Sequence, residues 1–403
     1  MKIAFTVNGP GEYAGWLRPL LFALYARVPA LDASVFFVPD DFATGREPEV
    51  ARAEFPRLRA FTSREYVRFA LGGTIAGAPE SVDRVQYLGG DLMHVARLHA
   101  RLGGEATSYK FSRARYRKRF ARVFAVDEPN RAQLLGWKTP PDRIQVVGNL
   151  AIDGALREAQ TPNEPVERFA ADAVLIMPGS RKAEIANLVP FYLQVALRLR
   201  RLEPSIPILF GISPFTTVEE LARALQRGGT PLAYGARGSV AVRDGAIFIA
   251  SQDGSQEFPA VYHALRAAAS ARLVVTIPGT KTIELAALGV PTIVTVPFNA
   301  PEAAVITGPL QYVERIPLVG IPIKRELALR FSRRFKYFAQ PNVDVDRELV
   351  PELWGTLTPG FVAQKLFERY ADDAWRQRSS VELRAIYGAH VGASQRMADA
   401  LAA

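Results

Sequence analysis

Short apolar runs alternate along this chain with segments of helical spacing, and this alternation limits the fold more than any other feature. Strands that alternate with helices form a parallel sheet covered on both faces. The helix between the first two runs has an i, i+3, i+4, i+7 apolar face formed by Leu17, Leu20, Leu21, Leu24 and Tyr25. The runs expected to be strands are Ile3–Val7, Ser34–Val38, Arg84–Leu88, Val123–Val126, Ile144–Val147, Ala173–Met177, Ile206–Ile212, Ala246–Ile249, Leu273–Ile277 and Thr292–Val296.

The alternation occurs in two halves of similar size, and 403 residues are enough for two or three domains. The polar segment Gly154–Asp172, which contains T-P-N-E-P, has the composition of a linker between them. We therefore expect an α/β fold of two facing, doubly wound domains, residues 1–160 and 161–371. Residues 372–403 are expected to be helices that pack on one of the two domains. Ligands of such sheets bind beyond the carboxyl ends of the strands.

Composition excludes several kinds of site. The chain has no cysteine, so disulfides, thiolate metal sites and cysteine nucleophiles are excluded. No two of its four histidines are spaced i, i+4, and no metal site is expected; they are His94, His99, His263 and His390. No stretch of about 18 apolar residues is present, so no spanning helix is expected. The opening M-K-I-A-F-T-V meets a turn too soon for a signal peptide, which makes the cytoplasm the expected location.

The net charge of +10 is concentrated in two stretches. Residues 110–122 contain seven cations and no acid, and residues 324–336 contain six cations and one acid, so the remaining residues are close to neutral. An anionic membrane attracts about 1 kcal/mol per basic residue held near it, which favours a lipid surface or lipid phosphate as the partner. Solvated helix faces are the second interpretation. Nucleic acid is the third and is disfavoured, because nothing resembles a base-reading module.

Glycine-rich turns follow two of the expected strands. The first, N-G-P-G-E-Y-A-G, carries Gly9, Gly11 and Gly15, which allow a tight turn and a close approach of backbone N–H groups to a ligand. An ordinary tight turn explains it equally well. The second, M-P-G-S-R-K-A-E, places Ser180 where an N-cap belongs and Arg181 in the first helical turn. A cation there opposes the helix dipole, which favours a bound anion as the explanation.

Two further segments carry polar groups. The turn T-I-P-G-T-K-T-I-E leads from a buried strand into a helix, where hydroxyls and N–H groups suit phosphates and a carboxylate can accept from ribose hydroxyls. A stabilised helix start explains the same spacing. The second segment, Q-P-N-V-D-V-D-R-E-L-V-P-E-L, is expected to be a loop entering a helix. The candidate ligand-binding residues of the two segments are Gly279, Thr280, Thr282, Glu284, Asn342, Arg347 and Glu348.

Together these segments resemble the ordered motifs of the lipid-A-disaccharide synthase family. The resemblance lies in M-P-G-S-R-x-x-E, G-T-x-T-I-E-L-A-A-L-G-V-P, P-N-x-x-x-x-R-E-L-V-P-E-L and the V-G-N-L-A-I-D that precedes the linker, and it covers most of residues 140–370. It implies two facing Rossmann-like domains of the GT-B type, with last helices that cross back to the N-terminal domain. It also implies a metal-independent, inverting transfer of an acylated glucosamine from UDP to a glycolipid. The residues implied to surround UDP are Ser180, Arg181, Thr280, Glu284, Asn342 and Arg347.

The N-terminal half departs from that family. Its G-E-x-S-G-D is replaced here by Gly11–Trp16, which keeps Gly11, Glu12 and Gly15, and one aspartate of D-x-P-D-F-N remains as Asp91. The tryptophan-rich S-P-x-x-W-A-W is absent, with Y-K-F-S in its place. Because this domain holds the acceptor in the family, the departures predict similar chemistry on a different acceptor. A peripheral location on the inner face of the cytoplasmic membrane, and a homodimer, are in keeping with the family.

Inverting transfer needs a base near the acceptor hydroxyl and donors near the departing diphosphate. Asp91 is the candidate base, although it suits a helix N-cap equally well. Glu12, His94 and His99 are further candidates, and Arg181 is the candidate for the leaving group.

Two other functions remain open. A UDP-sugar epimerase of the same architecture would use carboxylates and a histidine, for which His263, Glu257 and Asp253 are candidates. A non-catalytic homologue that binds a nucleotide sugar is the other.

Overall fold

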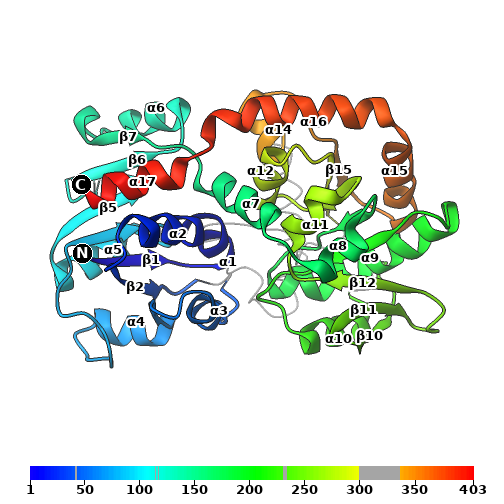
Figure 1. Cartoon of the computed structure of the whole chain (residues 1–403), viewed down its shortest axis with the longest axis horizontal. Helices are drawn as coiled ribbons and strands as arrows, with labels where there is room; N and C mark the ends of the chain where they lie inside the picture. Colours follow the sequence, from blue (N-terminus) through cyan, green and yellow to red (C-terminus); the bar gives the residue numbers. More distant parts are fainter. Residues whose placement is uncertain (41–42, 114, 117, 230–233, 299–335) are drawn as a thin grey trace. The chain divides into compact units, whose positions relative to one another are not determined.

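The computed structural model describes residues 1–403 apart from 41–42, 114, 117, 230–233 and 299–335. The chain divides into two compact units (Figure 1). Unit 1 comprises Met1–Gly154 and Tyr387–Ala403, and unit 2 comprises Ala155–Ile386. Both are α/β units, as the alternation predicts. The chain passes from unit 1 to unit 2 within helix α7, Leu150–Gln160.

Unit 1 is built on a seven-stranded, fully parallel sheet in the order β3-β2-β1-β4-β5-β6-β7. The order reverses between β1 and β4, which makes their carboxyl ends the topological switch point where ligands of such sheets bind. The strands are β1 (Lys2–Val7), β2 (Asp32–Phe37), β3 (Arg59–Phe61), β4 (Arg84–Tyr87), β5 (Glu105–Tyr109), β6 (Arg122–Ala125) and β7 (Ile144–Val146).

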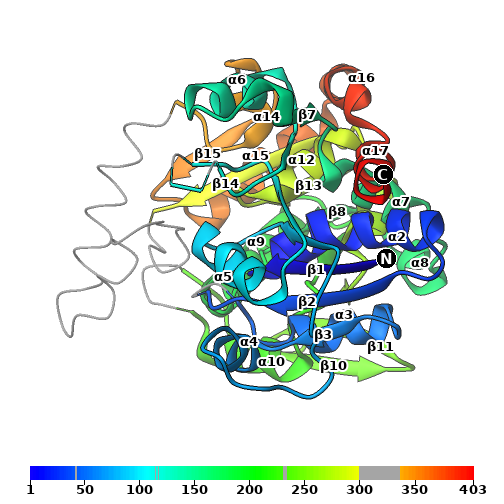
Figure 2. The ribbon, with the colours of Figure 1, turned by 90° about the vertical axis from the view of Figure 1, so that its left-hand side faces the viewer.

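Helices cover this sheet, and the C-terminal helix is one of them. Figures 1 and 2 show α17 beside α2, although hundreds of residues separate them in the sequence. One hydrophobic cluster contains Val85, Val95 and Leu98, where α5 packs on β4. The helices are α1 (Pro10–Glu12), a π-helix (Tyr13–Leu17), α2 (Arg18–Arg27), α3 (Glu47–Glu54), α4 (Ser63–Ala70), α5 (Leu92–Leu102), α6 (Glu128–Gly136), two 3-10 turns (Pro141–Arg143, Gly388–His390) and α17 (Ala393–Ala402).

Unit 2 contains an eight-stranded sheet in the order β10-β11-β12-β9-β8-β13-β14-β15. It is parallel from β12 to β15, but β10, β11 and β12 pair antiparallel, an edge that the alternation of strands and helices did not predict. Asp244 and Gly245 connect β10 to β11 with positive φ values of 50° and 77°, as a two-residue hairpin requires. The strands are β8 (Val174–Ile176), β9 (Ile208–Gly211), β10 (Gly238–Arg243), β11 (Ala246–Ser251), β12 (Glu257–Val261), β13 (Leu273–Thr276), β14 (Thr292–Pro297) and β15 (Glu352–Gly355).

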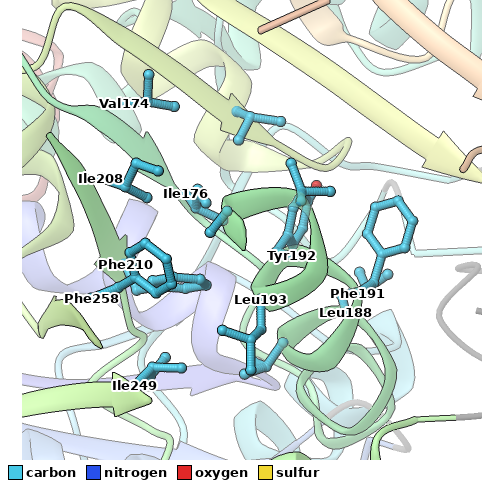
Figure 3. Packing of buried hydrophobic residues seen from close by; sticks show 14 of the residues in the cluster. Val174, Ile176, Leu188, Phe191, Tyr192, Leu193, Ile208, Phe210, Ile249 and Phe258 are labelled. Atoms are coloured by element: carbon cyan, nitrogen blue, oxygen red, sulfur yellow. The ribbon is translucent and has the colours of Figure 1, made fainter. Parts of the chain in front are cut away.

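The core of unit 2 forms where the long helix α9 packs near β8 and β9. Figure 3 shows Leu188 and Tyr192 of α9 in one buried cluster with Ile176, Ile208 and Phe210. Full burial of such side chains contributes about 1.5–3 kcal/mol each. The helices that lie wholly or mainly in this unit are α8 (Glu164–Ala170), α9 (Lys182–Leu202), α10 (Val218–Arg227), α11 (Ala264–Ser270), α12 (Thr280–Ala287), α14 (Gln340–Val345), α15 (Pro359–Ala371) and α16 (Asp373–Tyr387).

The segment expected to be a linker, Gly154–Asp172, is instead largely helical. It forms the end of α7 and all of α8, which buries Ala155, Val166 and Ala170 in a hydrophobic cluster with α11. Glu158 Oε1 accepts a hydrogen bond from the Leu265 N–H at 3.1 Å, which ties α7 to α11. In the C-terminal segment, α16 belongs to unit 2 and α17 to unit 1.

Candidate functional site

The switch point of unit 1 gathers the two carboxylates predicted there. Glu12 lies in α1, which begins directly after β1, and Asp91 follows β4. Both act on Tyr87: burial raises the pKa of this phenol, and the negative charges of Glu12 and then Asp91 raise it further. The structure therefore brings Glu12 and Asp91 to the carboxyl ends of neighbouring strands.

Glycines keep the backbone close together at this point. A Cβ on Gly89 would collide with the Asn8 side chain, and one on Gly90, at φ +89°, would collide with Val38. Asn8 Nδ2 donates to Asp40, which follows β2. The positive φ and the contact with Val38 therefore favour glycine at position 90, whereas a side chain at position 89 would displace Asn8.

The predicted acceptor-side glycines lie at the start of the first helices. Gly9 is the N-cap of α1 and is buried, and its N-cap φ of −134° is open to other residues. Gly11 lies within α1, and Gly15 lies in the π-helix, Tyr13–Leu17. Single π-helical turns occur frequently at functional sites. Trp16 in this turn meets Tyr109 edge-on, with ring centroids 5.5 Å apart.

Asp91 is the N-cap of α5, as one of its two interpretations predicted. Its side chain is also exposed, so the other interpretation, a catalytic base, stays a prediction. Its Oδ1 accepts from the Met93 N–H at 2.7 Å, and its backbone has the extended conformation of an N-cap. The cap uses Oδ1 and does not bury the carboxylate. His99, on the same helix, contacts the Gly104 carbonyl oxygen through Nε2 at 3.0 Å, away from the strand ends.

His94 follows Asp91 by three residues and is held by Tyr66 of α4. The Tyr66 hydroxyl lies 2.9 Å from Nδ1 of His94, and the two rings meet edge-on with centroids 5.3 Å apart. Burial lowers the pKa of His94, and nearby Arg97 lowers it further, while the Asp91 charge opposes the shift. The imidazole therefore favours its neutral form near pH 7.

The start of α9 in unit 2 differs from the prediction. Arg181, not Ser180, is the N-cap, because α9 begins at Lys182. Glu184 at position N3 accepts from the Ser180 and Arg181 N–H groups at 2.8 and 2.9 Å, and its other oxygen contacts Arg181 Nη1 at 3.3 Å. A carboxylate of this chain therefore balances Arg181 at the helix start. Gly179, at φ +106°, leaves room for Glu184, because a Cβ there would collide with its carboxylate.

The start of α12 has an accessible part and a buried part. Gly279, the N-cap at φ +145°, is exposed and Thr280 is partly exposed. Thr282 is buried; its hydroxyl donates to the Gly279 carbonyl oxygen at 2.8 Å and accepts from the Gln340 N–H at 3.3 Å. It thereby links α12 to α14.

Glu284, two residues after Thr282 in α12, is also buried. Its Oε2 lies 2.5 Å from Lys281 Nζ without hydrogen-bond geometry. This is an ion pair whose carboxylate retains capacity to accept.

Asn342 has no exposed surface and serves the fold. Its Oδ1 accepts from the Leu349 and Val350 N–H groups at 2.7 and 2.9 Å, and its Nδ2 donates to the Val350 carbonyl oxygen and to Glu352, each at 2.7 Å. Glu352 also accepts from the Phe338 and Ala339 N–H groups. In this conformation the Asn342 amide is committed to the loop that leads into β15.

Arg347 and Glu348, also predicted to lie near the donor, are exposed on this loop. Arg347 forms an ion pair with Glu382 of α16. The structure thus separates a buried Asn342 from two exposed charges that the sequence pattern groups with it.

The three residues considered for an epimerase, Glu257, Asp253 and His263, have separate contacts. Glu257 forms a two-pronged ion pair with Arg243 at 2.6 and 2.5 Å, across the antiparallel strands. A hydrogen bond from the Ser251 hydroxyl has the largest effect on Asp253, and hydrogen bonds from the N–H and hydroxyl of Ser255 add to it. Together they lower the pKa of Asp253 to about 2. His263 precedes α11. Within the described part of the chain, no contact joins this histidine to either carboxylate.

The basic stretch 110–122 has four exposed cations where the structure describes it, Arg113, Arg115, Lys118 and Arg119. Phe120 is buried within the same stretch, and Arg122 donates to the Ala400 carbonyl oxygen at 2.7 Å. The second stretch, 324–336, lies outside the described residues except for Lys336, whose Nζ lies 2.9 Å from Asp346 Oδ1.

The described residues offer neither a metal cluster nor a membrane-spanning helix. No group of three or more histidine or carboxylate side chains is placed to hold a metal ion there. Among the same residues, no helix is both long enough and apolar enough to cross a membrane.

The sequence prediction missed the contacts that hold α17 to unit 1. Asp153 accepts from the Gly392 and Ser394 N–H groups at 2.8 and 2.6 Å, so it caps α17 from another part of the chain. Arg396 Nε donates to the Val147 carbonyl oxygen at 2.7 Å. Both ends of V-G-N-L-A-I-D therefore hold the C-terminal helix. The aspartate in that segment was visible in the sequence, but its partners are more than 230 residues away.

Comparison with known proteins places the fold. No protein-family model matches this sequence, and no curated protein matches it either. A Listeria monocytogenes protein assigned as a UDP-N-acetylglucosamine 2-epimerase is similar in structure, with a TM-score of 0.51 and 12% identity over 94% of this chain and 90% of that one. Another UDP-N-acetylglucosamine 2-epimerase reaches 0.50 at 14% identity, over 98% and 94% of the chains. The Anabaena HepE protein, solved with UDP-glucose, reaches 0.50 at 11% identity, over 100% and 99%. The chain therefore has the fold of two Rossmann-like α/β domains, the GT-B type, that these proteins share.

Proposed function

We propose that this chain is an inverting glycosyltransferase that moves a glucosamine-type sugar from UDP to a lipid or glycolipid acceptor, as in lipid A disaccharide synthesis. Two carboxylates carry the proposal: Glu12 and Asp91 at the switch point of unit 1, both of which act on Tyr87. The likeness in fold to UDP-N-acetylglucosamine 2-epimerases and to a protein solved with UDP-glucose supports a UDP-sugar as the ligand.

The donor is assigned to the strand-to-helix junctions of unit 2. The exposed Gly279 and the partly exposed Thr280 at the start of α12 offer N–H groups and a hydroxyl to a phosphate. Arg181 offers a guanidinium at the start of α9, and its side chain keeps about a third of its surface exposed. The other predicted donor residues are Ser180, Thr282, Glu284, Asn342, Arg347 and Glu348, with Thr282 and Asn342 acting through the loops they hold.

The acceptor is assigned to the switch point of unit 1. An incoming hydroxyl must lose its proton as its oxygen attacks the anomeric carbon, and a group at the end of β4 or in α1 receives it. Asp91 and Glu12 remain the predicted catalytic carboxylates of this reaction. Gly9, Gly11 and Gly15 are proposed to shape the acceptor-side turn that follows β1. No metal takes part in the proposed reaction, so a chelator is expected to leave it unchanged.

A lipid acceptor explains the exposed cations of residues 110–122. Each basic residue held at an anionic surface contributes about 1 kcal/mol, and salt weakens that attraction. We therefore propose a peripheral location on the cytoplasmic membrane. A homodimer stays a prediction.

A UDP-sugar epimerase is the second candidate, because two of the structural neighbours carry that name. The carboxylates first considered for it, Glu257 and Asp253, are engaged with Arg243 and with serine hydroxyls. An epimerase would therefore use other groups.

Incubation with UDP-N-acetylglucosamine, with and without a lipid extract, separates the candidates. Release of UDP only when lipid is present supports transfer, and interconversion of the sugar without lipid supports epimerisation. UDP binding without either reaction indicates a non-catalytic homologue. Arg181→Ala is expected to raise the Kd for UDP at least about tenfold, because a charge-assisted hydrogen bond contributes about 1.5–3 kcal/mol. Arg198→Ala, an exposed cation on the same helix, is the matched control. Unchanged UDP affinity in the Arg181 variant would exclude that residue from the donor site.

A further inference from the structure

We propose that His94 accepts the proton of the acceptor hydroxyl and that Tyr66 sets the tautomer that allows it. This inference rests on the proposed glycosyl transfer and names one further catalytic residue for it. His94 lies on the first turn of α5, three residues after Asp91 and directly beyond the carboxyl end of β4. It therefore belongs to the same switch point as the two carboxylates.

The contacts of Tyr66 select one tautomer of the histidine. The Tyr66 hydroxyl lies 2.9 Å from His94 Nδ1 and donates to the His94 carbonyl oxygen at 3.4 Å. A hydroxyl has one proton, so if it donates to the carbonyl oxygen it can only accept from the ring. Because one hydroxyl proton cannot serve both acceptors fully, the pair of contacts favours the tautomer in which Nδ1 carries the ring proton. The neutral ring then presents Nε2 as a proton acceptor.

The Cδ2–Nε2 edge of the ring lies beside Gly90, which follows the carboxyl end of β4. A Cβ built on Gly90 would lie 3.6 Å from Cδ2, the ring atom bonded to Nε2. Among the described residues, no hydrogen bond is found for Nε2, and this atom is not one of the fully buried side-chain atoms that lack a partner. Tyr66 itself is buried, so the hydroxyl that holds Nδ1 is fixed by packing.

The charges around the ring suit a base that works near neutral pH. Burial lowers the pKa of His94, Arg97 of α5 lowers it further, and Asp91 of the N-cap opposes the shift. From α4, Tyr66 stays neutral, because burial raises its pKa to about 12. A neutral imidazole is a stronger base than a carboxylate at this pH. Asp91, which caps α5 through Oδ1, remains close enough to stabilise the imidazolium that forms.

The step balances without any further reactant. The acceptor O–H bond breaks and its proton moves to Nε2 while the oxygen forms a bond to the anomeric carbon. The bond from that carbon to the phosphate oxygen breaks, and its electron pair leaves with UDP.

The first test is the tautomer, which needs no substrate. Nitrogen-15 NMR of the full chain reports which ring nitrogen of His94 carries the proton. We expect protonation at Nδ1 in the wild type and a mixture of tautomers in Tyr66→Phe. A wild-type ring protonated at Nε2 overturns the inference whatever the enzyme does.

The second test is turnover, measured as UDP release from UDP-N-acetylglucosamine with a lipid extract. His94→Gln is expected to lower kcat at least about 100-fold, as loss of a general base does, with UDP affinity unchanged. Tyr66→Phe is expected to lower kcat less and to move the acidic limb of the pH profile to lower pH, because the imidazolium loses a hydrogen-bond acceptor. His99→Gln, whose ring faces Gly104, is the matched control.

The outcomes keep the two proposals apart. An active wild type whose His94→Gln variant keeps more than a third of its rate, or whose Tyr66→Phe variant has an unchanged pH profile, overturns the role of His94 alone. A wild type that never releases UDP overturns the proposed transfer and, with it, this role.

Discussion

Asn342 gives the sharpest test of whether a predicted ligand residue serves the fold instead. Asn342→Ala removes the acceptor of two N–H groups, those of Leu349 and Val350, which both belong to buried residues. A buried donor left without a partner costs about 1–3 kcal/mol. We therefore expect the loop that leads into β15 to lose about 3 kcal/mol of local stability, which corresponds to roughly 100-fold faster amide exchange.

Hydrogen exchange followed by mass spectrometry measures this at Leu349 and Val350 without a two-state assumption for a chain of two units. Asp344→Ala, an exposed position on the same helix, is the control and is expected to leave those amides protected. UDP binding is measured in parallel by calorimetry. Unchanged protection in Asn342→Ala together with a tenfold loss of UDP affinity would refute the structural role and restore Asn342 as a direct ligand contact.

Two further perturbations test contacts in unit 1. Asp153→Ala removes the acceptor of the Gly392 and Ser394 N–H groups, and we expect a loss of about 1–2 kcal/mol, as for an N-cap, seen as faster exchange and proteolysis of α17. Asp399→Ala breaks an exposed ion pair on the same helix and should cost no more than about 1 kcal/mol; equal protection of α17 in both variants would contradict the capping role. In the capping box of α4, the hydrogen bond from the Thr62 N–H lowers the pKa of the Glu65 carboxylate in the folded state. The ionised carboxylate therefore stabilises the folded state at a pH above its pKa in the unfolded chain. This stabilisation is lost as the pH falls through the pKa that Glu65 has in the folded state. The difference in Tm between wild type and Glu65→Gln should therefore shrink between about pH 5 and pH 3, and a constant difference would argue against the linkage.

Periodicity predicted the fold class because buried parallel strands are continuous apolar runs. It missed β3 and β5, whose sequences R-A-F and E-A-T-S-Y are short or polar, although their residues are mostly buried. It also missed β10, which pairs with β11 through the hairpin at Asp244 and Gly245, and β12, which pairs with the other edge of β11. That Asp-Gly pair is a hairpin signal visible in the sequence. The linker was predicted from composition, whereas small apolar residues at helical spacing decided its structure.

The candidate site was predictable where one strand end determines it and unpredictable where partners are distant. Glu12 and Asp91 could be placed at the carboxyl ends of strands from local pattern alone. Tyr66 could not be linked to His94, because the two residues are 28 positions apart and the sequence between them gives no sign that α4 packs beside α5. Asn342 shows the opposite failure, because a polar residue between prolines suggests a ligand contact until its buried partners are known.

The contacts at the helix start beside Arg181 change which helix start is the better place for the diphosphate of the donor. A cation beside the positive end of a helix dipole suggested a missing anion, but Glu184 supplies that anion from within the chain. The Ser180 and Arg181 N–H groups already donate to the same carboxylate, so a phosphate there must compete with a nearly buried acceptor. At α12 the N-cap Gly279 is exposed and a Cβ there would meet nothing within 4 Å. Because an accessible helix start binds an anion without displacing an internal one, the diphosphate of the donor is better placed at α12, with Arg181 contributing charge from α9.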